Sequence, residues 1–133
     1  NGELIASGVN KVPAVCDPTA HAELLAISEA CRTLKRTDLS DCDLYASGEP
    51  CPMCIGAIYW ARPRNVFYAC SKKEAMQAVG FPDRIGHFYT EIQLPPAERS
   101  IPFQELPSEQ RLEPFFTWLK HRKNVQNQKD REA

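Results

Sequence analysis

The chain has 133 residues and a formal net charge of −1, with ordinary apolar (43%) and charged (25%) fractions. A chain of this length fits one domain with its own hydrophobic core, so we expect residues 1–133 to form a single domain. The near-neutral charge excludes binding of nucleic acid by the charge of the molecule as a whole. Basic side chains do gather near the C-terminus, at Lys120, Arg122, Lys123, Lys129 and Arg131.

The sequence gives no sign of membrane insertion or secretion. No stretch approaches the roughly 18 apolar residues of a membrane helix, and the N-terminus lacks the pattern of a signal peptide. We therefore expect a cytoplasmic location, where the six cysteines indicate metal binding and free thiols rather than disulfides. The chain opens on a strand-like run without Met, so we expect a further segment before Asn1 in the gene product.

Apolar patterning in the first third of the chain predicts a strand at residues 4–9, a loop at 10–18 and then a helix. Asp17 and Pro18 are typical of a helix start. Apolar residues at spacings of three and four continue this helix to Leu34.

Two further strands are predicted at residues 43–47 and 65–70, separated by a helix at 50–62. That helix is apolar nearly all round, so we expect it to be buried. A short helix at 72–79 should end at Gly80.

The last third of the chain is less regular. Residues 82–107 are rich in proline and predict mainly loop, with one strand at 89–94. A helix is predicted at 108–120, followed from about residue 124 by a polar, frayed tail. Strands that alternate with helices indicate an α/β fold with parallel pairing.

Two short motifs carry the residues best suited to chemistry, His21-Ala22-Glu23 and Cys51-Pro52-Met53-Cys54. Two thiolates and an imidazole suit Zn²⁺, and three protein ligands leave the fourth tetrahedral position open, as in catalytic sites. Each motif lies at a predicted helix N-terminus, whose positive end favours thiolates. Glu23 is not needed as a ligand and can instead move protons beside the metal.

Each motif alone has a simpler explanation. The Cys51–Cys54 pair could be a redox pair or half of a structural zinc site, and His21 an ordinary polar residue. On a regular helix His21 and Glu23 would also project about 200° apart, so both can face one metal only near a helix start. Together, however, His-x-Glu followed after about 30 residues by Pro-Cys-x-x-Cys is the pattern of zinc-dependent deaminases. We therefore predict that His21, Cys51 and Cys54 bind zinc and that Glu23 is catalytic.

The sequence around these motifs resembles the cytidine-deaminase-like superfamily, and within it the guanine deaminases of bacteria. The resemblance extends over nearly the whole chain. The matching runs are residues 17–23, 49–54 and 56–63, Gly80-Phe81-x-Asp83, Pro96-Ala97-Glu98-Arg99 and Ile101-Pro102-Phe103.

This resemblance implies a three-layer α/β/α fold with a mostly parallel mixed sheet, forming one zinc-dependent deaminase domain. It implies a hydrolase that converts a purine base, guanine, to xanthine and ammonia. It also implies base contacts from the Asn10 side chain, the Ala22 backbone N–H and the Asp83 carboxylate. The partner it implies is a second copy, in a homodimer whose C-terminal segments are exchanged to cap each other's sites.

The chain departs from the family at both ends. The family's N-terminal helix and first strand, which precede the run at residues 4–9, are absent here. Some relatives also end in an aromatic residue that reaches the partner's pocket, and this tail has none; His121 and Trp118 are the candidates to replace it.

Two other functions remain open at this stage. A tRNA-specific adenosine deaminase would share the zinc motifs, and the C-terminal basic cluster would suit phosphates. The same cluster is also explained as a solvated helix end, and residues 69–74 lack the Lys-Thr-Gly-Ala-like loop of those enzymes. A non-catalytic, zinc-stabilised binding module is the third reading, against which Glu23 argues. The sequence does not decide between a base and a nucleoside as substrate.

Overall fold

The computed structural model describes residues 2–132. The chain divides into two compact units, Asn1–Phe88 and Tyr89–Ala133. No helix in the described part of the chain is both long and apolar enough to cross a membrane.

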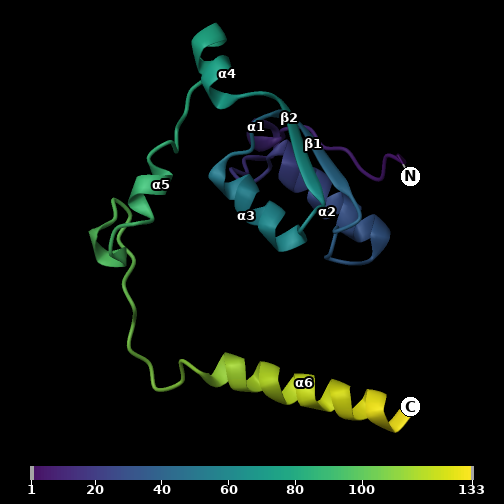
Figure 1. Ribbon diagram of the computed structural model, residues 1–133. Helices are drawn as coiled ribbons and strands as arrows, with labels where there is room; N and C mark the ends of the chain where they lie inside the picture. Colours follow the sequence, from purple (N-terminus) through teal and green to yellow (C-terminus); the bar gives the residue numbers. More distant parts are fainter. Residues whose placement is uncertain (1, 133) are drawn as a thin grey trace. The chain divides into compact units, whose positions relative to one another are not determined.

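The first unit is built around a β–α–β arrangement (Figure 1). Its elements are α1 (Val12–Val15), α2 (Ala22–Leu34), β1 (Asp43–Gly48), α3 (Pro52–Ala61), β2 (Asn65–Cys70) and α4 (Lys72–Val79). Strands β1 and β2 pair in parallel, with Tyr45 opposite Phe67. A parallel pair needs a crossover connection, and α3 supplies it. The α/β class predicted from the sequence is confirmed.

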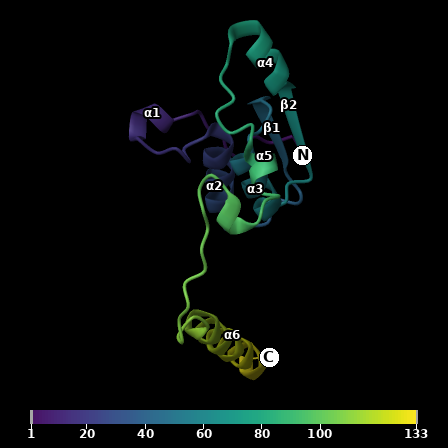
Figure 2. The ribbon, with the colours of Figure 1, turned by 90° about the vertical axis from the view of Figure 1, so that its left-hand side faces the viewer.

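Helices α2 and α3 pack together beside this two-stranded sheet (Figure 2). Among the described residues the buried apolar side chains are Ala20, Leu39, Cys54 and Ala61. The core of the first unit therefore includes the start of α3. On the sheet, the stacked rings of Tyr45 and Phe67, with centroids 5.0 Å apart, are exposed.

The prediction of a strand at residues 4–9 is wrong, because this segment has no strand pairing in the structure. A strand exists only where a neighbour accepts its backbone hydrogen bonds, and in the described residues β1 and β2 pair with each other alone. The segment instead runs against α2. A Cβ added to Gly8 would lie 2.9 Å from the backbone nitrogen of Ala26, so only glycine permits this close approach.

The start of α2 also differs from the prediction. The helix begins at Ala22, and Asp17 stands before it in a turn, accepting hydrogen bonds from the Thr19 amide (2.8 Å) and hydroxyl (2.7 Å). These bonds lower the pKa of Asp17 below its ordinary value. The predicted loop at 10–18 contains the short helix α1, with Asn10 Oδ1 accepting from the Val12 amide at 2.9 Å. Asx turns of this kind use the residues that also favour helix caps, which is why the boundary was misplaced.

Helix α3 is correctly predicted in position, but its burial is not. Cys54 and Ala61 are buried on one side, whereas Tyr59 and Trp60 are 78% and 88% exposed. Gly56, one turn before them, is exposed too. Helix α3 therefore has two apolar faces. One face packs in the core of the first unit, and the other, with Gly56, Tyr59 and Trp60, is exposed; we call it the bare face of α3.

Strand β2 and helix α4 occupy the predicted residues. Ser71 accepts from the Glu74 amide at 3.1 Å while the Glu74 carboxylate accepts from the Ser71 amide at 2.8 Å, forming a capping box. Gly80 ends the helix with φ of 66°, in the left-handed region that favours glycine.

The second unit holds the 3₁₀ turn η1 (Pro96–Glu98) and helix α6 (Glu113–Glu132), and helix α5 (Phe88–Glu91) spans the boundary. The predicted strand at 89–94 is wrong, since α5 and a turn occupy it. The predicted helix at 108–120 begins later and continues to Glu132. Its polar end consists largely of good helix formers, and Gln126 donates to Asp130 one turn on at 2.9 Å.

Candidate metal centre and active site

Three side chains from two motifs meet at one point in the first unit. His21 Nδ1 lies 3.5 Å from Cys51 Sγ and 3.5 Å from Cys54 Sγ, and the two sulfur atoms lie 3.6 Å apart. All three cysteine and histidine donor atoms fall within 4.8 Å of one another. The structure therefore brings together the three predicted ligands.

Helix starts position all three side chains. His21 is the N-cap of α2 and Cys51 the N-cap of α3, and neither side chain makes a capping hydrogen bond. Both side chains are thus available to the cluster. Cys54 follows in the first turn of α3, where Pro52 fixes the entry of the chain into the helix.

The three donor distances suit a zinc ion. A tetrahedral ion with Zn–S of about 2.3 Å and Zn–N of about 2.0–2.1 Å sets its S–S edge at about 3.8 Å and its S–N edges near 3.6 Å. The observed separations of 3.6 Å and 3.5 Å come close to these values. The donor set is also the one that zinc prefers, and it supplies three of the four positions of a tetrahedron.

Cys54 is fully buried and its thiol is unusually hard to ionise without a metal. Burial raises the pKa of the Cys54 thiol, and the adjacent Cys51 and the negative charge of Glu23 raise it further. A metal ion must therefore displace a proton from this site on binding, which makes its affinity dependent on pH.

Glu23, the second residue of α2, lies beside the cluster. Its carboxylate is close enough to Cys54 to act on the pKa of that thiol. The expected 200° divergence from His21 does not arise, because His21 has extended backbone angles (φ −73°, ψ 149°) and stands outside the helix. His21 and Glu23 can therefore face the same point.

The three predicted base-contact residues have different surroundings. Ala22 is the first residue of α2, so its N–H belongs to the amides that a helix leaves unpaired. The exposed Asn10 uses Oδ1 to accept from the Val12 amide, which leaves its Nδ2 donors unaffected. Asp83 follows α4 and pairs through Oδ2 with Lys72 Nζ at 3.5 Å.

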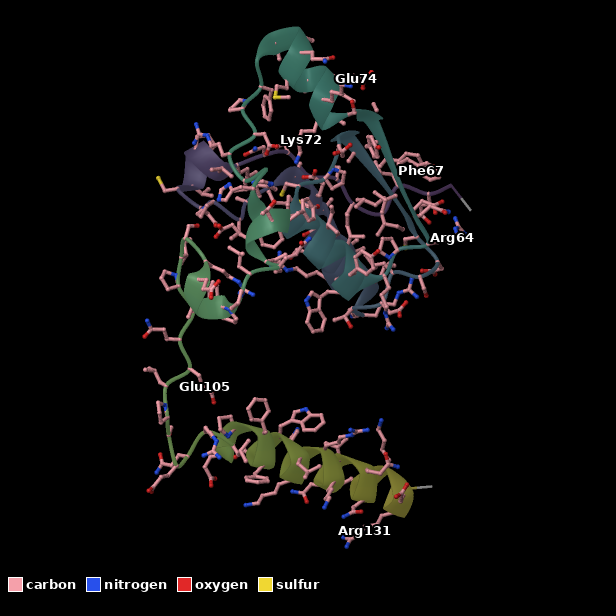
Figure 3. The ribbon with its side chains drawn as sticks, turned by 60° about the vertical axis from the view of Figure 1, so that its left-hand side comes forward. Arg64, Phe67, Lys72, Glu74, Glu105 and Arg131 are labelled. Atoms are coloured by element: carbon pink, nitrogen blue, oxygen red, sulfur yellow. The ribbon has the colours of Figure 1, made fainter. Side chains whose placement is uncertain are left out.

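The parallel sheet brings the loops that follow β1 and β2 to one edge. Glu49, which follows β1, donates its amide to the Cys70 carbonyl at the end of β2 (2.8 Å). Cys51 lies three residues after the end of β1, and Lys72 lies two residues after the end of β2. Figure 3 shows Arg64 and Lys72 at opposite ends of β2. In open α/β sheets the carboxyl ends of the strands are where ligands bind.

Comparison with known proteins agrees with this geometry. The model of the cytidine and deoxycytidylate deaminase zinc-binding region matches residues 1–70. The guanine deaminase of Bacillus subtilis (strain 168) is 48% identical over 130 residues, which cover 98% of this chain and 79% of that protein. The chain belongs to the cytidine and deoxycytidylate deaminase family. The resemblance noted from the sequence is confirmed, and the family's zinc-binding region contains His21, Cys51 and Cys54.

Solved structures confirm the cytidine-deaminase-like fold. The X-ray structure of the Bacillus subtilis guanine deaminase superposes with a TM-score of 0.82 at 50% identity, over 90% of this chain and 74% of that one. The tRNA-specific adenosine deaminase of Aquifex aeolicus (strain VF5) is 45% identical, but over 73 residues that cover 55% of this chain and 48% of that protein. The similarity to this tRNA enzyme is therefore partial.

Sequence reasoning missed two residues of this region. Gly8 lets the N-terminal segment lie against the first turns of α2, next to Ala22, Leu25 and Ala26. The Ser7-Gly8-Val9 run held the signal, since a glycine inside a strand-like stretch often marks a close backbone approach. Lys72, which pairs with Asp83, gave no signal in the sequence.

Proposed function

We propose that this protein is a zinc-dependent guanine deaminase, which hydrolyses guanine with water to xanthine and ammonia. The observation that carries the proposal is the 48% identity to a guanine deaminase over 98% of the chain. The similarity to a tRNA-specific adenosine deaminase covers 55%. The zinc cluster with Glu23 beside it supports an enzyme over a binding module, because an acid–base group next to a metal serves no purpose in a structural site.

In this proposal His21 Nδ1 and the sulfur atoms of Cys51 and Cys54 hold the ion, and Glu23 moves protons. Zinc, when bound, acts as a Lewis acid and makes hydroxide available near neutral pH. The Glu23 carboxylate accepts the proton of the attacking water and delivers it to N3 of guanine. It then takes the remaining proton from the hydroxyl group now on C2 and gives it to the amine, so that the C2–N bond breaks, ammonia departs and a carbonyl oxygen stays on C2.

The base is held by three groups. Ala22 offers a backbone N–H and Asn10 a side-chain amide that both donates and accepts. Asp83 offers only acceptors, so it selects a ring or exocyclic N–H. A base that presents lone pairs there would leave a carboxylate unsatisfied, which costs more than a missing apolar contact.

A substrate panel tests the proposal. Purified, zinc-loaded protein is incubated with guanine, guanosine, adenine, cytosine, cytidine and a tRNA carrying an anticodon adenosine, and ammonia or inosine is measured. Guanine should be the preferred base by about 10⁴-fold in kcat/KM, because a site built to hydrogen-bond a substrate N–H rejects a base without it by about 10⁴–10⁵. Deamination of the tRNA without guanine turnover would instead establish the tRNA enzyme, for which the basic residues of α6 would supply phosphate contacts.

We further propose a homodimer that uses the bare face of α3. Gly56, Tyr59 and Trp60 lie on one side of this helix, and the two aromatic side chains are 78% and 88% exposed. An aromatic patch of this kind on a surface helix is typical of an interface.

Exchange of the C-terminal segments within that dimer is part of the proposal. A mixed dimer of a Glu23→Gln chain and a chain truncated before α6 tests it. With exchange, the intact α6 of the first chain completes the site of the second and activity appears. Without exchange, neither site is complete and the mixture stays inactive.

We propose a cytoplasmic location because the cysteines of this protein are free thiols. All six cysteines, which lie within the described residues, are free, and zinc ligation requires Cys51 and Cys54 to stay reduced. Localisation of the tagged protein in cell fractions checks this.

A further inference from the structure

The Asp83 carboxylate is held from two sides. Its Oδ2 atom lies 3.5 Å from Lys72 Nζ, and the two side chains are only 27% and 31% exposed. A Cβ added to Gly86 would fall 2.9 Å from Asp83 Cγ and nearer still to Oδ2, but 3.3 Å from Oδ1. Oδ2 of the carboxylate therefore lies close to both Gly86 and Lys72, and Oδ1 lies farther from Gly86.

The position of Lys72 is unfavourable for α4 itself. It is the first residue of the helix, where the positive end of the helix dipole disfavours a cation. The start of α4 is already stabilised by the capping box of Ser71 and Glu74. Pairing with Asp83, rather than stabilisation of α4, is therefore what this lysine contributes.

The pair also joins the Asp83 loop to the edge of the sheet where the metal ligands lie. Lys72 lies two residues after the end of β2, and the Cys70 carbonyl at that end accepts a hydrogen bond from the amide of Glu49, the residue after β1 (2.8 Å). Fixing Asp83 to Lys72 places the carboxylate relative to that edge (Figure 3 labels Lys72).

We propose that Lys72 is a positioning residue for base recognition. It binds Oδ2 of Asp83 and keeps Oδ1 for the substrate N–H, and Gly86 leaves the space that this orientation needs. The inference rests on the proposed function, in which Asp83 reads the purine.

Guanine kinetics of substituted full-length, zinc-loaded protein tests the inference. Lys72→Met should raise the KM for guanine and lower kcat/KM by about 10–100-fold, because misplacing a substrate-binding group by about an ångström has this effect. The value of kcat should change less than KM, and Lys72→Arg should restore most of the loss. Lys73→Met is the matched control, an exposed neighbour on the same helix, and should leave both constants unchanged.

Gly86→Ala is a second variant that should displace the Asp83 carboxylate, and it changes no charged residue. Its methyl group would displace the Asp83 carboxylate, so KM should rise as it does in Lys72→Met. A normal KM in Gly86→Ala would overturn the inference even if Lys72→Met failed to fold.

A double-mutant cycle with Asp83→Ala separates this inference from the proposed function. Once Asp83 is gone, Lys72→Met should have no further effect on KM. An equal effect in both backgrounds, or a normal KM in Lys72→Met while Asp83→Ala is impaired, would show that Lys72 does not act through Asp83. Normal guanine turnover in Asp83→Ala would instead remove Asp83 from the proposed site, and Lys72 with it.

Discussion

His21 Nδ1 lies 3.5 Å from Cys51 Sγ, although 30 residues separate them in the sequence. Each of these residues is the N-cap of its helix, so the contact joins the starts of α2 and α3. A metal at this point therefore links the two helices that pack together beside the small sheet. Zinc binding and the stability of the first unit should be coupled.

Cys54→Ser should remove most of the zinc and lower the melting temperature. The substitution replaces a buried thiolate ligand by a hydroxyl, for which zinc has a weaker preference. Elemental analysis and thermal denaturation measure the two effects. Cys16→Ser, at an exposed cysteine outside the cluster, is the control and should keep full zinc content. Full zinc content in Cys54→Ser would remove this residue from the ligand set.

Glu23→Gln should retain zinc but lose about 10²–10⁴-fold in kcat, the usual contribution of a positioned proton-transfer group. The amide keeps the size of the side chain and leaves the three ligands untouched. Steady-state kinetics with guanine, together with elemental analysis, checks both halves of the statement. Glu29→Gln, on the exposed side of the same helix, should behave as wild type. Turnover near the wild-type rate in Glu23→Gln would exclude it as the proton shuttle.

The zinc cluster could be predicted from the sequence because its ligands come from two short motifs, each within a few residues along the chain. Ligand identity and the His-x-Glu and Cys-x-x-Cys spacings are properties of single helix starts. The sequence could not show how His21 and Glu23 converge, because this depends on whether the helix begins at Asp17 or at Ala22. Asp17 has the chemistry of a helix cap but uses it in a turn with Thr19.

Asp43→Asn should destabilise the protein at neutral pH and have little effect in acid. Arg64 donates two hydrogen bonds to Asp43 (3.0 and 2.6 Å), and these, with one from Asn65, lower the pKa of the Asp43 carboxyl. A lowered folded-state pKa gives stability that is present above the unfolded value of about 3.9 and is lost as pH falls through the folded value.

The melting temperature of wild type and Asp43→Asn, measured across pH, checks this prediction. The difference in melting temperature between the two proteins should be largest at neutral pH and should disappear below the pKa of Asp43 in the folded protein. Arg64→Met should show the same pH dependence, because it removes the other partner. A gap that persists unchanged in acid would mean that the ion pair is not its cause.

Trp60→Glu should convert the proposed dimer to a monomer without loss of zinc. The substitution puts a charge at the centre of the bare face of α3, where Trp60 is 88% exposed in the single chain, and desolvating that charge at an interface is costly. Sedimentation velocity over a range of concentrations measures the change. Lys35→Glu, just beyond the end of α2, is the control for an added negative charge. A dimer that survives Trp60→Glu would place the interface elsewhere.

The parts that the sequence misjudged depend on contacts beyond the local pattern. Residues 4–9 have the composition of a strand, but a strand needs a hydrogen-bonded neighbour. The aromatic residues of α3 are apolar, but composition does not say which face another surface covers. The Lys72–Asp83 pair links residues that follow different elements, and its existence depends on the turn at Gly80.

The proposed hydrolysis of guanine requires one zinc ion in the cluster of His21, Cys51 and Cys54. Stepwise addition of zinc to chelator-stripped protein, with guanine consumption and xanthine formation followed by ultraviolet absorbance, tests it most directly. We predict no turnover without metal, and a rate that rises linearly and reaches its limit at about one equivalent of zinc per chain, the stoichiometry of a three-ligand site. Guanine turnover by the metal-free protein would show that zinc is not required, and no turnover after full zinc loading would show that guanine is not the substrate.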